Sequence, residues 1–158
     1  RVTVRCRTYL NSVEETCESL RNQGVKVEPA PYLPYAFKIS EYNHILALDA
    51  FIQGKIVAQD VSSMLVSEIA NPQKGDYIID MCAAPGGKSI HLGDKMEGFG
   101  TVDARDVSQY RWSLSTKTFT VQELSMFRLM CRMRRYLMWN LNVRRILFLQ
   151  MYHAADME

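Results

Sequence analysis

The sequence feature that most constrains the fold is a short apolar segment that runs directly into a turn rich in proline and glycine. Residues 77–81 have the pattern of a strand buried on both faces. The turn Ala83-Ala-Pro-Gly-Gly87 follows, residues 87–96 have the pattern of a helix, and residues 101–105 that of a second strand. This order predicts the start of a parallel, doubly wound sheet.

The turn itself has the properties of a ligand site. Gly86 and Gly87 allow unusual φ values and a close approach of the backbone to a ligand, and the free N–H groups at a helix start favour negative charge. Asp106 follows the second strand, about 20 residues beyond the glycines, where an acidic side chain can accept hydrogen bonds from ribose hydroxyls. A cofactor that carries a carboxylate fits this arrangement.

Other interpretations of the turn are weaker. A dinucleotide fingerprint requires Gly-x-Gly-x-x-Gly, which is absent from the sequence. A phosphate-binding P-loop requires a glycine five residues before Gly87, and Cys82 occupies that position, although Lys88 and Ser89 would supply the end of the motif. The glycines could also serve only as turn formers.

The residues before the turn predict a small α/β unit at 1–42, followed at 43–110 by the first part of the main domain. Ser12 and Glu15 form a capping box for a helix that ends near Gly24. Predicted strands lie at 2–6, 25–28, 37–39 and 55–58. Asp60 is the predicted N-cap of another helix, whose inward residues would be Val61, Met64, Leu65 and Ile69.

The composition changes abruptly at Tyr110. All 8 Gly and all 5 Pro precede this residue, whereas both Trp follow it. Residues 1–110 contain 11 Lys and Arg and 14 Asp and Glu, but residues 111–158 contain 8 and 3. A folded tail needs turn residues, and this one has few. We therefore interpret 111–158 as a tail outside the pattern of the domain.

A shift of reading frame near Tyr110 would explain the tail. Reading residues 144–157 one base out of frame allows the sequence ADILFADVPCSGYG, a strand followed by a Pro-Cys motif. The alternative is a genuine helical extension rich in Met and Arg. Under the frameshift hypothesis we expect the tail to be poorly ordered, since it cannot complete the sheet, and its Arg132, Arg134 and Arg135 would not form a designed RNA-binding patch.

The segment from Gly54 to Ser108 resembles the catalytic domain of the Sun-type bacterial RNA cytosine-C5 methyltransferases, which modify small-subunit ribosomal RNA. Two motifs carry this resemblance, Gln59-Asp-Val-Ser-Ser63 and Cys82-Ala-Ala-Pro-Gly-Gly-Lys88. The resemblance implies a Rossmann-like class I S-adenosylmethionine-dependent methyltransferase core, here incomplete, preceded by a small α+β unit of an RNA-binding type. It also implies S-adenosyl-L-methionine as cofactor and ribosomal RNA as partner.

Family site residues can be transferred to this chain by position. The resemblance implies that the cofactor loop and the ribose-binding acid are Cys82, Ala83, Ala84, Pro85, Gly86, Gly87, Lys88 and Asp106, and that Asp80 supports the turn. The family uses two cysteines, one of which attacks C6 of cytosine while the other assists release. Neither cysteine motif is present here, so we expect this chain to be inactive alone. The alternative is a non-catalytic module that binds S-adenosylmethionine or RNA.

Further expectations concern isolated side chains. Arg5 and Arg7 share a face of the first strand and its exit, which makes them candidates for contact with RNA phosphates, although ordinary solvated charges are an equal alternative. His91 is expected to be packed or at the surface rather than catalytic. Cys6 and Cys17 are expected to be small apolar fillers, and a covalent role is not favoured for Cys82 or Cys131.

The cysteine spacing predicts thiols and no metal site, because the sequence has no Cys-x-x-Cys pair and no His at metal spacing from a Cys. The sequence has no apolar run long enough to cross a bilayer and no leader pattern. We therefore expect a cytoplasmic monomer. Because the chain starts at Arg1 rather than at Met, we also expect a fragment of something longer.

Overall fold

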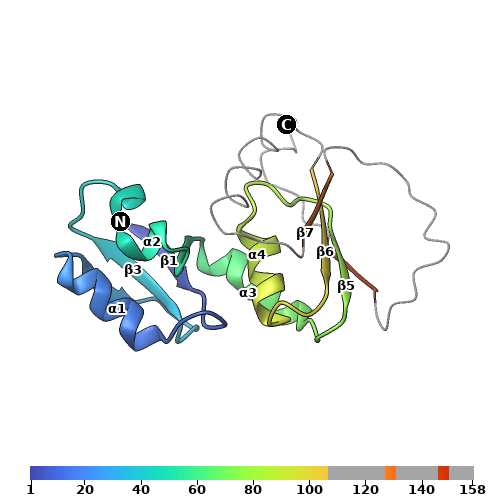
Figure 1. The fold of residues 1–158 in the computed structure, drawn as a ribbon, viewed down its shortest axis with the longest axis horizontal. Helices are drawn as coiled ribbons and strands as arrows, with labels where there is room; N and C mark the ends of the chain where they lie inside the picture. The colour runs from blue at the N-terminus through green and yellow to red at the C-terminus, as the bar shows by residue number, and fades with distance from the viewer. Residues whose placement is uncertain (107–126, 131–145, 150–158) are drawn as a thin grey trace. The chain divides into compact units, whose positions relative to one another are not determined.

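The computed structural model describes residues 1–106, 127–130 and 146–149 (Figure 1). The chain divides into two compact units, Arg1–Ile69 and Ala70–Glu158. Most of the predicted tail, and with it the expectation of poor order, lies outside the described residues.

The first unit contains both strands and helices. Its elements are β1 (Val2–Cys6), α1 (Val13–Asn22), β2 (Lys26–Pro29), β3 (Ala36–Ser40), the 3-10 helix η1 (Ile45–Ala47), α2 (Asp49–Ile52), β4 (Ile56–Ala58) and α3 (Val61–Ala70), whose last residue already belongs to the second unit. The hydroxyl of Ser12 accepts a hydrogen bond from the Glu15 N–H, so the predicted N-cap of α1 is confirmed. The sequence did not predict η1 and α2.

The strands of this unit form an antiparallel sheet in the order β2-β3-β1-β4. Alternate residues of each strand point to opposite faces. On one face, side chains from β1, β3 and β4 join side chains from α1 and α2 in a single core, whose buried members include Val4, Cys6, Cys17, Leu20, Phe37, Ile39, Ala50 and Ile56. Both helices therefore cover the same face of the sheet.

Helix α3 packs through a different set of side chains. Met64 is fully buried and lies in a cluster with Ala30, Leu33 and Ala36. The prediction that Ile69 points inward is wrong, because its side chain is 84% exposed. The buried residues of α3 are Met64 and Ser67, and the half-buried Glu68 accepts a short hydrogen bond from the Tyr35 hydroxyl. Ile69 lies about 100° further around the helix than Glu68.

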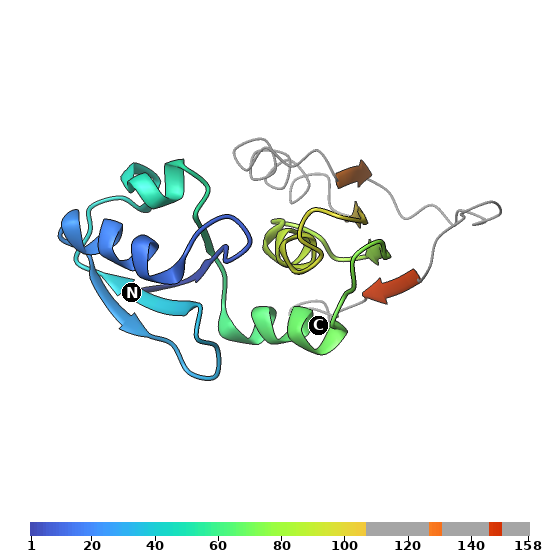
Figure 2. The same ribbon diagram turned by 60° about the horizontal axis from the view of Figure 1, so that its bottom comes forward.

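The second unit contains the predicted parallel sheet. Its elements are β5 (Tyr77–Asp80), α4 (Gly87–Lys95), β6 (Thr101–Arg105), β7 (Phe127–Met130) and β8 (Ile146–Leu149). The strands are parallel in the order β7-β6-β5-β8. Counted along the chain, this is the order 3-2-1-4 of a doubly wound dinucleotide-binding sheet. Figure 2 shows α4 lying along this sheet, and Leu92 and Met96 of the helix pack on Ile78 and Val102.

Two findings differ from the sequence predictions. The first unit extends beyond residue 42, since β4 pairs with β1 and so belongs to its sheet. A boundary near 42 also divides η1 and α2 from the sheet on which they pack. In the tail, where a helical extension was the alternative, residues 127–130 and 146–149 are strands.

Candidate cofactor-binding site

The predicted site lies at the carboxyl end of β5. In doubly wound sheets, ligands bind beyond the carboxyl ends of the strands at the point where the strand order reverses. That point is the junction of β5 and β8, because β6 and β7 continue the sheet on the other side of β5. The turn that leaves β5 therefore lies where sheets of this type bind their ligands.

Asp80 anchors the start of the turn. Its carboxylate is 0% exposed, and its two oxygens accept hydrogen bonds from the Cys82 N–H at 3.1 Å and from the Ser89 hydroxyl at 2.6 Å. Burial raises the pKa of this carboxyl, whereas the hydrogen bonds from Ser89 and Cys82 oppose the rise. The expectation that Asp80 supports the turn is confirmed, and Ser89 joins it from the first turn of α4.

Backbone hydrogen bonds fix the rest of the turn. The Ala83 N–H donates to the Arg105 carbonyl at 2.9 Å, and the Gly86 N–H donates to the Ala83 carbonyl at 2.7 Å. Gly86 has φ 112° and caps α4, whose first residue is Gly87. A residue with a Cβ is disfavoured at this φ, so the glycine is needed where the chain reverses into the helix. The N–H groups of the first helical turn then lie beside the strand end.

Asp106 meets the turn from the neighbouring strand. It follows β6 directly, is 2% exposed, and accepts a hydrogen bond from the Ala84 N–H at 3.1 Å. The structure thus brings together the glycine turn and Asp106, the two parts of the predicted site. Ala84 and Asp106 are 22 residues apart in the sequence. An acidic side chain, a glycine with positive φ and a helix N-terminus therefore lie together at the carboxyl end of the sheet.

The remaining loop residues differ in accessibility. Ala83, Ala84 and Gly86 are buried, Pro85 is exposed, and Cys82, Gly87 and Lys88 are half-buried. Buried small residues allow the backbone, rather than side chains, to form the surface of the loop. This arrangement is consistent with recognition of a ligand through backbone N–H groups.

Sequence reasoning missed Ser89 as a site residue. Its hydroxyl is fully buried against Asp80 and ties the first turn of α4 to the end of β5. The available signal was its position nine residues after Asp80, on the far side of the glycines. The spacing alone does not predict the hydrogen bond, which forms because the turn places the start of α4 beside the end of β5.

His91 is packed, as expected, at 3% exposure on α4. Cys6 and Cys17 are also buried as expected, and they lie in the core of the first unit. Burial raises the pKa of the Cys6 thiol to about 12 and also raises the pKa of Cys17. Both thiols are therefore poor nucleophiles at neutral pH. Cys131 lies outside the described residues.

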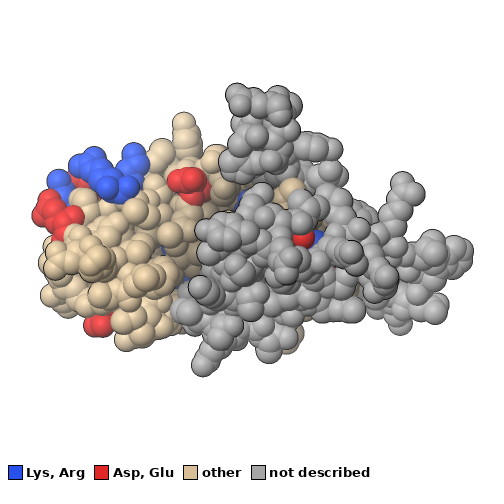
Figure 3. Space-filling view, turned by 90° about the horizontal axis from the view of Figure 1, so that it is seen from above, with Lys and Arg blue, Asp and Glu red and all other residues tan. Residues whose placement is uncertain are grey.

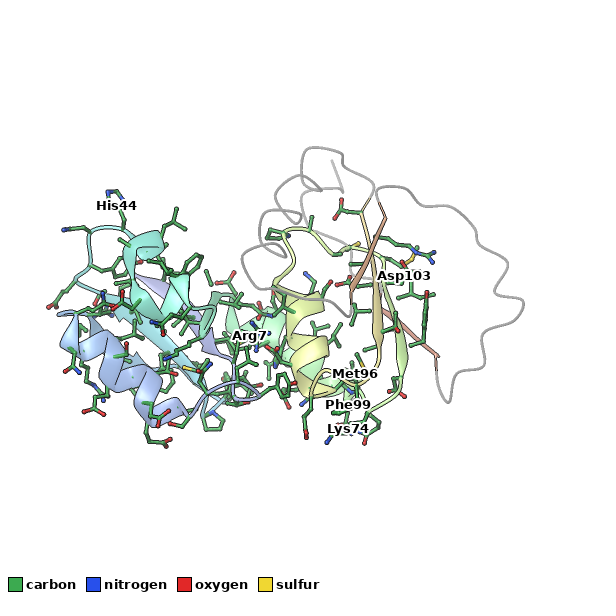
Figure 4. All side chains as sticks on the ribbon, in the orientation of Figure 1. Arg7, His44, Lys74, Met96, Phe99 and Asp103 are labelled. Atoms are coloured by element: carbon green, nitrogen blue, oxygen red, sulfur yellow. The ribbon has the colours of Figure 1, made fainter. Side chains whose placement is uncertain are left out.

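The structure places Arg5 and Arg7 away from solvent. They are 1% and 2% exposed. Arg5 Nε donates to Gln59 Oε1 at 3.0 Å, and Arg7, labelled in Figure 4, donates to the Gly54 carbonyl at 3.3 Å. In this arrangement both guanidinium groups bind polar atoms of their own unit. Phosphate contact by these two residues stays a prediction.

Within residues 1–106 and the two short strands, no group of three or more His, Cys, Asp or Glu side chains could hold a metal ion. None of the helices described in the structure is long and apolar enough to span a bilayer.

Comparison with known proteins identifies the family. Residues 66–148 match the family model described as 16S rRNA methyltransferase RsmB/F. The chain belongs to this family. The match includes the turn and both strands that flank α4. It also continues beyond Tyr110 and does not test the reading frame there, so the frameshift stays a prediction.

Curated relatives of this RsmB/F chain carry consistent names. It is 35% identical over 89 residues to the ribosomal RNA small subunit methyltransferase B of Photorhabdus laumondii, which covers 56% of this chain and 21% of that protein. It is 32% identical over 112 residues to the probable ribosomal RNA small subunit methyltransferase B of Bacillus subtilis, covering 71% and 25%. The chain thus spans about a quarter of the length of these relatives.

Solved structures support the fold. The RsmB/F chain is similar to PH0851, with a TM-score of 0.75 and 29% identity, over 80% of this chain and 29% of that one. A methyltransferase homologue from Pyrococcus horikoshii gives a TM-score of 0.72 and 27% identity, over 81% and 42%. The predicted fold class, a Rossmann-like class I methyltransferase core that is here partial, is confirmed. S-adenosyl-L-methionine is the cofactor of this methyltransferase class.

Proposed function

We propose that the protein binds S-adenosyl-L-methionine at residues 82–88 with Asp106, as part of an enzyme that methylates cytosine C5 in small-subunit ribosomal RNA. The observation that carries the proposal is the hydrogen bond from the Ala84 N–H to the Asp106 carboxylate. This bond joins the acidic side chain to the turn at the carboxyl end of the sheet, where folds of this type bind ligands.

The residues of the turn fit the parts of this cofactor. The N–H groups at the start of α4 favour its carboxylate, and Asp106 accepts hydrogen bonds from its ribose hydroxyls. Gly86 keeps the backbone close to the ligand, while Asp80 and Ser89 hold the turn in shape. When bound, the cofactor supplies an electrophilic methyl group.

Methylation at cytosine C5 requires more than cofactor binding. The carbon is a weak nucleophile until a thiolate adds to C6, so a reactive cysteine must reach the base. Cys6 and Cys17 are buried with raised pKa values, and Cys82 lies in the cofactor loop. The sequence contains no Pro-Cys motif. We therefore propose that this chain binds the cofactor but does not transfer its methyl group alone.

Calorimetric titration with S-adenosylmethionine tests the binding site. Asp106→Asn retains an oxygen that can accept from Ala84 but removes the charge, so we expect the Kd to rise by about tenfold or more, the loss of a charge-assisted hydrogen bond. Asp49→Asn, at an exposed residue of the first unit, is the matched control and should leave the Kd unchanged. Equal affinity of wild type and the Asp106 variant would refute the site.

A methyl-transfer assay with unmodified small-subunit ribosomal RNA separates the two functional candidates. We expect no 5-methylcytosine from this chain, even at cofactor concentrations that saturate the calorimetric site. That result fits a cofactor-binding module, the alternative function for the chain as given. Formation of 5-methylcytosine would show that a cysteine outside the family motif is catalytic, and would overturn the proposed inactivity.

A further inference from the structure

The sheet of the first unit has one face that α1 and α2 do not cover. The order β1, α1, β2, β3, α2, β4 is that of a split β-α-β unit, and α1 and α2 share a core on one face. Residues Thr3 and Arg5 of β1, Lys38 of β3 and Val57 of β4 alternate with the core residues and therefore belong to the opposite face, here called the outer face.

Helix α3 covers only one end of the outer face. Ala36 of β3 lies in the cluster around Met64, and Arg5, its partner across the sheet, is buried. Two residues further along, Thr3 pairs with Lys38, and Lys38 pairs with Glu28 of β2. Lys38 is exposed. The outer face therefore has a covered end and an exposed end.

The exposed end is rich in cations. Arg1 and Lys26 both bind the carboxylate of Glu28, at 3.4 and 3.0 Å, and their side chains are 62% and 48% exposed. The hydrogen bond from Lys26 and the charges of Arg1 and Lys38 lower the pKa of Glu28. Lys38 has no carboxylate within ion-pairing distance among the described residues. Figure 3 shows Lys and Arg side chains gathered over one part of the described surface.

Among the described strand residues, the exposed end carries no aromatic side chain. Four-stranded sheets that read RNA bases do so with aromatic rings on the exposed face. The exposed end here consists of Thr3, Lys26, Glu28, Lys38 and Ser40 of the strands, with Arg1, which pairs with Glu28. Such a surface can neutralise phosphates but offers no ring on which a base could stack.

We propose that the exposed end of the outer face binds the phosphate backbone of RNA without regard to base sequence, with Arg1, Lys26 and Lys38 as the contacts. The proposal depends on the proposed function only in taking RNA as the partner. Three cations around one carboxylate leave an excess of positive charge, and a polyanion complements it. The cationic surface differs from Arg5 and Arg7, which the structure buries.

Fluorescence anisotropy of the full chain with labelled 20-nucleotide oligouridylate and oligocytidylate tests the surface. We expect both probes to bind equally. Lys26→Gln with Lys38→Gln should weaken binding about fivefold or more near 0.15 M salt and reduce the slope of log affinity against log salt by about 1.4, or about 0.7 for each phosphate contact. Arg21→Gln with Lys74→Gln removes the same charge from exposed residues elsewhere and is the matched control.

Several outcomes would overturn the proposal. Equal effects of the two double variants would show a response to net charge alone, and no effect of the Lys26 and Lys38 variant would place the RNA elsewhere. A strong preference for one probe would indicate base reading. Binding to polyglutamate as tight as to RNA would indicate a different anionic partner.

A second readout does not require a variant. Protection of Lys26 and Lys38 from acylation by bound RNA, with Lys74 unprotected, is expected. Loss of cofactor binding in calorimetry with intact RNA binding would count against the proposed function only, so the two proposals fail separately.

Discussion

Asp80 holds the cofactor turn in place through its buried carboxylate. It lies at the end of β5 with no exposure, and both its oxygens accept hydrogen bonds from the turn and from α4. Asp80→Ala would leave the Cys82 N–H and the Ser89 hydroxyl without their acceptor, at a cost of about 1–3 kcal/mol for each buried group. Asp80→Asn keeps one acceptor and is expected to cost less.

The raised pKa of Asp80 predicts a pH dependence. A carboxyl whose pKa is higher in the folded than in the unfolded protein binds its proton more tightly in the folded protein. Its contribution to the free energy of unfolding is therefore fully present at low pH and declines as the pH rises above the ordinary pKa of 3.8. Urea unfolding from pH 4 to 7 should show this decline relative to Asp80→Asn. Ser89→Ala removes a bond that lowers the pKa and should extend the decline to higher pH. A constant difference between wild type and Asp80→Asn would contradict the assignment.

At the scale of elements, the loop between α4 and β6 is fixed by a close approach at Gly100. Its φ is +153°, and a Cβ added there would lie 2.6 Å from the Met96 sulfur and 2.8 Å from the Asp76 carbonyl oxygen. Met96 and Phe99 lie together at this end of the unit in Figure 4. The loop is also tied to the start of β5, because the Thr101 N–H donates to the Asp76 carbonyl at 3.0 Å.

Gly100→Ala is therefore expected to destabilise the protein by about 2–4 kcal/mol, the sum of overpacking and backbone strain. Gly75→Ala is the matched control, because Gly75 also has a positive φ of +89° but nothing lies within 4 Å of the added Cβ. It should cost only about 1–2 kcal/mol. Chemical denaturation measures both, and equal losses would show that the Met96 contact contributes nothing.

The sequence predicted the elements whose signals are local. Strands β5 and β6 and helix α4 lie within a residue of their predicted bounds, since an apolar run, a glycine turn and a helical pattern each act within a few residues. Helix α2 has four residues, which is too short for a periodic pattern. The pairing of β4 with β1 joins residues 50 or more positions apart and has no local signal.

The candidate site shows the same limit. The turn and Asp106 could be predicted from glycine spacing and strand ends, whereas the Asp80 to Ser89 bond depends on how α4 packs against β5. Arg5 carries the same charge as Lys38 in the sequence and shares its face of the sheet. Arg5 pairs with Ala36, which packs against Met64 of α3, and is buried, whereas Lys38 lies beyond this contact and is exposed.

The whole molecule consists of two units that each have a hydrophobic core. The clusters around Leu20 and Met64 belong to the first unit, and the cluster around Ile78 belongs to the second. Separate cores allow a protein to open in separate cooperative units. A ligand that binds one unit then stabilises that unit by RT ln(1 + [L]/Kd), about 2.7 kcal/mol at a hundredfold excess over Kd.

Hydrogen exchange with and without S-adenosylmethionine tests this division at the scale of the chain. With the cofactor at about a hundredfold excess over its Kd, exchange of core amides in β5 and α4 should slow by up to about 100-fold. Amides of β1 and β3 should be unchanged, since the proposed site has no residue in the first unit. In Asp106→Asn, whose Kd should be about tenfold higher, the same cofactor concentration should slow the β5 and α4 amides by no more than about tenfold and leave those of β1 and β3 unchanged. Equal slowing of β1 and β5 would show that the units unfold as one, because a ligand can stabilise distant amides only through a shared unfolding step.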